Sequence, residues 1–157
     1  MSFVPLSREG IAVRRRRILV AGGPNVRKTT TLLTTPAPRS ILSMPGEKGY
    51  DTLPLDDPDT TAVIWEAAQQ IDPKTGQTVR PDSSSVVNAV YNESVRLITT
   101  PGLTSFCGDG VHKLFDFCLD SVSAGSFFAG EEFDPKLYAA AGRLFYDYLN
   151  RVVHSGV

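Results

Sequence analysis

Short apolar runs recur along the chain, separated by longer segments of mixed polarity. Four of these runs are brief and rich in β-branched or other apolar residues, and most are followed closely by glycine or proline. That pattern is typical of buried strands. The predicted strands are residues 18–20, 41–44, 61–65 and 103–107.

Helical spacing of apolar positions marks the segments between and after these strands. Asp134 is followed by Pro135, the expected order of a cap and a first-turn proline. Pairs of proline, or proline with glycine, stop two of the other segments. The predicted helices are residues 28–33, 86–98, 111–122 and a last one from 135 to about His154.

The order of strands and helices predicts an α/β fold in three layers, with a mainly parallel sheet. Residues 14–157 would form this one domain, and residues 1–13 a flexible lead-in. Residues 72–76, with an early proline and a final glycine, predict a turn that joins a surface hairpin. Residues 121–130 are rich in small residues and predict a flexible connection.

Composition narrows the class of protein. A chain of 157 residues, 41% of them hydrophobic, suits one domain with one core. The net charge of −1 gives no general attraction to nucleic acid or to anionic membranes. Its apolar runs are far shorter than the roughly 20 residues of a membrane span, and the first residues lack a signal-peptide layout. Cys107 and Cys118 have no metal-binding spacing, so we expect buried free thiols and a cytoplasmic setting.

The strongest chemical signal lies between the first predicted strand and the first predicted helix. A phosphate-binding loop needs a strand, a G-x-x-x-x-G-K-[ST] turn and a helix, so that backbone N–H groups converge on phosphate oxygens. Lysine then supplies a charge to the outer phosphates, and the hydroxyl holds Mg²⁺. The candidate nucleotide-binding residues are Gly22, Gly23, Pro24, Asn25, Val26, Arg27, Lys28, Thr29 and Thr30.

One position departs from that pattern. Arg27 stands where the second glycine is expected. Glycine there allows the backbone to turn tightly, whereas a side chain risks an unfavourable positive φ and crowds the phosphates. Two outcomes stay open: arginine weakens or abolishes nucleotide binding, or it points outward and is tolerated.

Two carboxylates complete the candidate site. Asp109 ends an apolar strand, the arrangement in which an aspartate holds Mg²⁺ through water. The alternative role of Asp109 is to cap the helix that begins at Val111. Glu47 follows the strand 41–44 and is a candidate general base for an attacking water, or else a solvated loop residue.

Residues 22–30, Glu47 and the segment 106–119 together resemble the phage-type RecA-like P-loop ATPases, which include single-strand annealing and recombination proteins. The resemblance covers roughly residues 14–157. It implies binding of ATP with Mg²⁺ and Glu47 as the candidate general base, but it does not establish DNA binding. The first hypothesis is a weak ATPase coupled to single-stranded DNA recombination or annealing. In this family a strand follows the helix that here ends near His154, so we expect a RecA-like fold that is incomplete at the C-terminus. The strands would then close up, a second copy or a partner protein would complete the sheet, or the fold would be marginal.

Other functions compete with this one. Arg27 and the missing strand favour a degenerate, non-catalytic P-loop scaffold that serves as a structural or protein-interaction module. A small kinase is disfavoured because residues 120–134 contain no arginine for a lid. A packaging motor is disfavoured because Gly110 occupies the position of its usual glutamate. The basic run 14–17 is either a solubilising flank or a phosphate contact.

Overall fold

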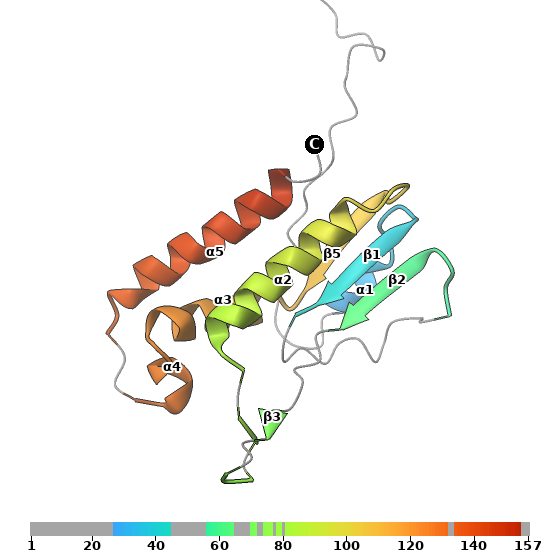
Figure 1. Ribbon diagram of the computed structural model, residues 1–157. Coiled ribbons are helices and arrows are strands. Elements are labelled where there is room, and N and C mark those ends of the chain that lie inside the picture. Colours follow the sequence, from blue (N-terminus) through green and yellow to red (C-terminus); the bar gives the residue numbers. More distant parts are fainter. Residues whose placement is uncertain are drawn as a thin grey trace, which may run out of the picture.

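The computed structural model describes most of the chain after the predicted phosphate-binding loop (Figure 1). The described residues are 27–44, 56–64, 70–71, 74–76, 78–79, 81–131 and 134–154. The elements in chain order are α1 (Lys28–Leu32), β1 (Arg39–Ser43), β2 (Thr60–Ile64), β3 (Gln70–Ile71), β4 (Thr78–Val79), α2 (Ser83–Ile98), β5 (Ser105–Asp109), α3 (Val111–Val122), α4 (Ser126–Ala129) and α5 (Leu137–His154).

The main sheet has three parallel strands in the order β2-β1-β5. Ser43 at the end of β1 pairs in register with Ile64 of β2 on one side and with Asp109 of β5 on the other. The carboxyl ends of all three strands therefore lie at one edge of the sheet. The prediction of an α/β fold with a parallel sheet is confirmed.

Side chains alternate between the two faces of this sheet. Ile41 and Cys107 are buried on the face that carries Leu32 and Leu33, at the end of α1 and just after it. Leu42, the next residue along β1, belongs to the larger core on the opposite face. The sheet thus lies between α1 on one side and the longer helices on the other (Figure 1).

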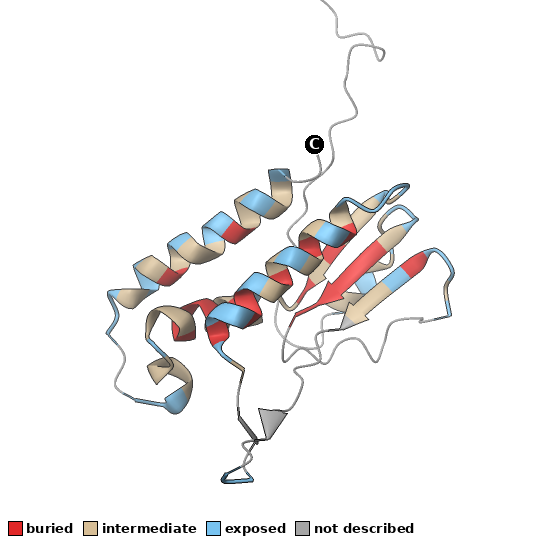
Figure 2. Cartoon of the chain, in the orientation of Figure 1, coloured by how far each residue is buried: buried red, intermediate tan, exposed pale blue. Residues whose placement is uncertain are grey.

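The larger core is built by α2, α3 and α5. Its buried residues lie mainly on α2 and α3, and fewer come from β1 and α5 (Figure 2). Helix α5 joins this layer from outside, by packing against α3 and α2. The buried residues of the larger core are Leu42, Met44, Val86, Val87, Val90, Leu97, Leu114, Cys118, Leu119, Ala141 and Tyr148. None of the described helices is both long enough and apolar enough to cross a membrane.

Several boundaries differ from those predicted. Helix α2 begins three residues early because the Asp82 carboxylate accepts a hydrogen bond from the backbone N–H of Ser85, at 2.8 Å. Strand β5 begins at Ser105 because a turn occupies the preceding residues, with Gly102 at φ 81°. The hairpin around the turn is confirmed, as β3 and β4 pair antiparallel. The lead-in and the strand predicted at 18–20 lie outside the described residues.

The segment predicted to be a flexible connection contains the short helix α4. Two side chains from the end of α3 supply acceptors for its first turn. Ser123 Oγ accepts from the N–H of Phe127 at 3.1 Å, and Asp120 Oδ1 accepts from the N–H of Phe128 at 2.8 Å. These bonds satisfy helix-terminal donors, so composition alone was a poor guide to this segment.

Candidate functional site

The two residues predicted to hold Mg²⁺ lie in contact. Thr29 is the second residue of α1, and Asp109 is the last residue of β5. The Thr29 hydroxyl donates a hydrogen bond to Asp109 Oδ2 at 2.7 Å, across 80 residues of sequence. Asp109 is buried, with 8% of its surface exposed. A hydrogen bond between a hydroxyl and a carboxylate thus links the start of α1 to the end of β5.

Asp109 owes this position to the local sequence. The strand before it is anchored in the sheet, and the Met44 N–H donates to the Asp109 carbonyl at 2.9 Å. Gly110 then takes a left-handed conformation, with φ 74°, and α3 begins without a side-chain cap. The Asp109 carboxylate therefore does not cap α3. It accepts the hydrogen bond of the Thr29 hydroxyl instead.

Arg27 adopts the backbone conformation that the sequence pattern reserves for glycine. Its φ of 58° and ψ of 31° place it in the left-handed region, directly before α1. The Arg27 carbonyl accepts from both the N–H and the hydroxyl of Thr31, each at 3.0 Å. The side chain is exposed, so arginine occupies a strained backbone position without burying its charge.

Helix α1 is held to the sheet at its other end as well. Arg39, at the start of β1, donates from Nη1 to the carbonyls of Leu33 and Thr35, the latter at 3.0 Å. Its Nη2 also lies 3.7 Å from a carboxylate oxygen of Asp57. Thr35 Oγ1 lies 3.5 Å from Cys107 Sγ, within hydrogen-bonding distance. These contacts fix the orientation of α1 and therefore the position of Thr29.

Both cysteines are buried free thiols, as the sequence predicted. Burial raises the pKa of the Cys107 thiol, an effect that its contact with Thr35 partly opposes. Burial alone raises the pKa of the Cys118 thiol to about 11. Both groups are therefore neutral at physiological pH, and neither is suited to act as a nucleophile.

The structure adds a residue that the sequence pattern did not single out. Ser43 ends β1 beside Asp109 and is buried, with 2% of its surface exposed. Its hydroxyl finds no hydrogen-bond partner among the described residues. The only signal in the sequence is a lone serine inside the apolar run 41–44. The strand register is needed to show that this serine lies beside Asp109.

The remaining predicted site residues are only partly described. Lys28 opens α1 and is half-buried, and Thr30 is exposed on the same helix. The other nucleotide-binding candidates, Gly22, Gly23, Pro24, Asn25 and Val26, lie outside the described residues. Glu47, the candidate base, also lies outside them.

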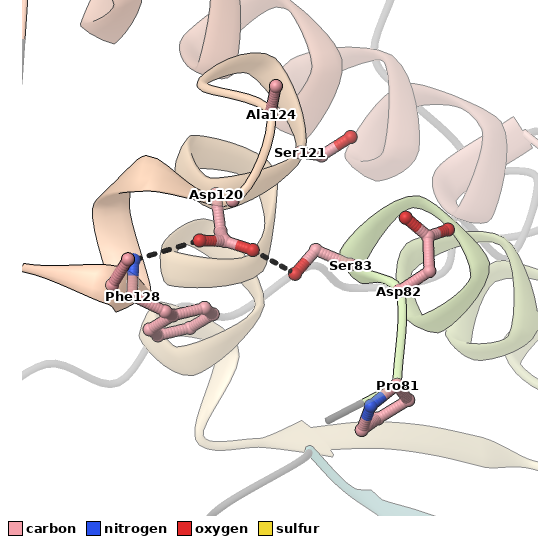
Figure 3. Close-up of a pocket in the computed structure, with 9 residues that line it drawn as sticks. Pro81, Asp82, Ser83, Asp120, Ser121, Ala124 and Phe128 are labelled. Atoms are coloured by element: carbon pink, nitrogen blue, oxygen red, sulfur yellow. Dashed lines mark hydrogen bonds between the residues drawn. The ribbon is translucent and has the colours of Figure 1, made fainter. Parts of the chain in front are cut away.

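A pocket of about 410 Å³ opens elsewhere, where α2 begins and α3 ends (Figure 3). Its central carboxylate, Asp120, is buried and accepts hydrogen bonds from Ser83 Oγ at 2.5 Å and from the N–H of Phe128 at 2.8 Å. Asp120 lies nine residues beyond Val111, or about 14 Å along the helix. The buried Asp120 carboxylate is thus already satisfied by donors of the protein itself, so we interpret the pocket as a packing junction rather than the functional site.

The site that remains is the edge of the sheet at Thr29 and Asp109. A hydroxyl and a carboxylate are hard oxygen ligands of the kind that Mg²⁺ prefers. In open parallel sheets, ligands bind at the carboxyl ends of the strands, where both residues lie. Comparisons of the chain with protein-family models, with curated proteins and with solved structures find no match.

Proposed function

We propose that this chain binds ATP with Mg²⁺ at the amino end of α1, within a RecA-like P-loop fold. The observation that carries the proposal is the 2.7 Å hydrogen bond between Thr29 and Asp109. The sequence pattern predicts both residues as ligands of the same ion, because Thr29 follows a lysine at a helix start and Asp109 ends a strand. Independent folding constraints then bring them together.

The chemistry of the pair supports a cation site. Asp109 supplies a negative charge at the sheet edge. Thr29 supplies a neutral oxygen, which can coordinate a metal through a lone pair when its proton points away from the ion. A bound Mg²⁺ would neutralise charge on the nucleotide phosphates. Lys28, one residue before Thr29, would pair with the outer phosphates, and Glu47 would orient the attacking water in any hydrolysis.

A second candidate function is a P-loop scaffold that has lost catalysis. The observation that favours it is Arg27, which holds a left-handed φ of 58° that costs a residue with a Cβ about 1 kcal/mol. In the phosphate-binding pattern, a side chain at this position would also crowd the phosphates. Under this alternative the Thr29–Asp109 bond is retained only for the packing of α1 on the sheet.

Titration of the full chain with a fluorescent ATP analogue, with and without Mg²⁺, tests the proposal. We expect saturable binding that Mg²⁺ strengthens, and loss of that strengthening in Thr29→Val, which keeps the side-chain shape but lacks the hydroxyl. Thr34→Val is the matched control. Its hydroxyl is exposed and donates only to the Thr31 carbonyl, at 2.7 Å, away from Asp109.

Three results separate the candidates. Mg²⁺-dependent binding that Thr29→Val weakens and Thr34→Val leaves intact supports the proposed cation site. No saturable binding up to millimolar analogue overturns ATP binding by this chain and favours the scaffold. If Thr29→Val and Thr34→Val change binding equally, the result counts against a metal role for Thr29.

A further inference from the structure

The buried hydroxyl of Ser43 is unusual because it has no described hydrogen-bond partner. Buried polar side chains nearly always find a partner, and one without a partner costs stability. Ser43 is 2% exposed, so bulk water does not satisfy it. Such a group is expected where a ligand or an ordered water completes the hydrogen bond.

The strand register fixes the surroundings of this hydroxyl. Ser43 pairs with Asp109, and Ile41 pairs with Cys107, in the parallel ladder between β1 and β5. Paired residues of neighbouring strands point to the same face, and residues two apart along a strand do too. Ile41 packs beneath α1, and Asp109 bonds to Thr29 of α1, so Ser43 also faces α1.

Ser43 therefore stands beside the Thr29–Asp109 pair. Neighbouring strands are about 4.8 Å apart, a separation that one water molecule bridges with two ordinary hydrogen bonds. The edge thus gathers two hydroxyls and one carboxylate, from α1, β1 and β5. Each oxygen suits either Mg²⁺ itself or a water in its shell.

We propose that Ser43 is the third oxygen of this cation site, and that its hydroxyl binds a water of the hydrated Mg²⁺ that accompanies the nucleotide. This inference rests on the proposed function. Mg²⁺ usually keeps several of its waters, and these need acceptors and donors fixed by the protein. The Asp109 carboxylate only accepts hydrogen bonds when ionised, whereas the Ser43 hydroxyl both donates and accepts. Ser43 thus complements Asp109 in orienting the water shell.

The test compares Ser43→Ala and Ser43→Cys with the unaltered full chain. Ser43→Cys keeps most of the side-chain volume but hydrogen-bonds weakly. Ser40→Ala is the matched control, because Ser40 is equally buried in the same strand but lies three residues away, on the opposite face. The probes are ATP with Mn²⁺, whose free concentration is followed by electron paramagnetic resonance, and thermal unfolding without ligand.

We expect both Ser43 variants to need about fivefold more Mn²⁺ for half-maximal binding with ATP, the effect of one hydrogen bond. Metal-free ATP binding should not change, and neither should the Mn²⁺ requirement of Ser40→Ala. Without ligand, Ser43→Ala should unfold at the same or a higher temperature, because it removes an unsatisfied group.

The outcomes distinguish this inference from the proposed function. If the unaltered chain shows no metal-dependent ATP binding, the proposed function fails and the role of Ser43 falls with it. If the unaltered chain binds and the Ser43 variants keep its Mn²⁺ requirement, only the role of Ser43 is overturned. A lower unfolding temperature of Ser43→Ala without ligand, together with an unchanged Mn²⁺ requirement, assigns the hydroxyl to a structural water and also overturns the inference.

Discussion

Tyr148 of α5 and Ser94 of α2 share a buried hydrogen bond, with 2.9 Å between the phenolic oxygen and Ser94 Oγ. Tyr148 is 5% exposed and Ser94 is 0% exposed. Ser94 Oγ also donates to the Val90 carbonyl at 2.8 Å, so within this pair Tyr148 is the donor and Ser94 the acceptor. The bond fixes α5 against the layer that covers the sheet, across 54 residues of sequence.

Removing the phenolic hydroxyl should weaken this attachment. We expect Tyr148→Phe to lower the free energy of unfolding by about 1 kcal/mol, because Ser94 keeps its bond to Val90 and only one hydrogen bond is lost. Urea unfolding measures the change. In a double-mutant cycle, Tyr148→Phe should cost less in a Ser94→Ala background, and equal costs in both backgrounds would argue against a coupled pair.

The Asp120 junction should contribute more to stability. Asp120→Ala leaves the Ser83 hydroxyl and the Phe128 N–H without their buried acceptor, so we expect a loss of about 2–3 kcal/mol in unfolding free energy. Asp147→Ala, at an exposed position of α5, is the control and should change stability by less than about 0.5 kcal/mol. Equal effects of the two substitutions would show that the junction is not a structural one.

The sequence predicted features that depend on local order. Helix α3 has the predicted bounds, Val111–Val122, because apolar periodicity and the glycine before it define both ends. The backbone strain expected at Arg27 is present, since a loop of that pattern needs a positive φ there. The roles proposed for Thr29 and Asp109 in metal binding stay predictions, and the structure adds that the two side chains are in contact.

Features that depend on distant pairing could not be predicted. Nothing near Ser83 in sequence indicates Asp120, which lies 37 residues away and becomes its partner only when α2 and α3 pack together. Ser43 cannot be recognised from the sequence for the same reason, because its significance comes from pairing with Asp109 in the sheet. The sequence does not predict helix α4, because acceptors at the end of α3 support its start and four residues carry little periodicity.

Two glycines should respond in opposite ways to alanine. A Cβ on Gly142, within α5, would meet no atom within 4 Å, so Gly142→Ala should stabilise the fold by about 1 kcal/mol through helix propensity. A Cβ on Gly108 would lie 3.2 Å from Met44 Cε and 3.3 Å from Val111 Cγ2, so Gly108→Ala should destabilise it by about 1 kcal/mol. Thermal unfolding of both variants checks the signs, and a stabilised Gly108→Ala would contradict the packing at Met44.

Stability should decline in alkaline solution, in part because of Cys118. Burial raises the pKa of its thiol from 9.0 to about 11, so the folded state favours the neutral thiol. The contribution of this buried neutral thiol to the free energy of unfolding is complete below pH 9.0 and is lost as the pH rises toward about 11. Urea unfolding at pH values of about 8 and about 10.5 should show a smaller decline for Cys118→Ala than for the unaltered chain. Cys107 and Tyr148 remain in that variant, so an identical decline would assign the effect to them instead.

Replacing Arg27 by glycine should separate the two candidate functions. Glycine accepts the φ of 58° without a Cβ, so strain of about 1 kcal/mol is relieved, while backbone entropy offsets most of the gain in stability. We expect Arg27→Gly to bind the Mg²⁺ complex of a fluorescent ATP analogue about tenfold more tightly than the unaltered chain, a change of 1.4 kcal/mol. Ala124→Gly is the control, because its φ of 53° is relieved in the same way in the turn after α3, without any change in binding. Equal affinities of Arg27→Gly and the unaltered chain would show that arginine is tolerated at this position. They would also remove the main support for the second candidate function, a non-catalytic P-loop scaffold.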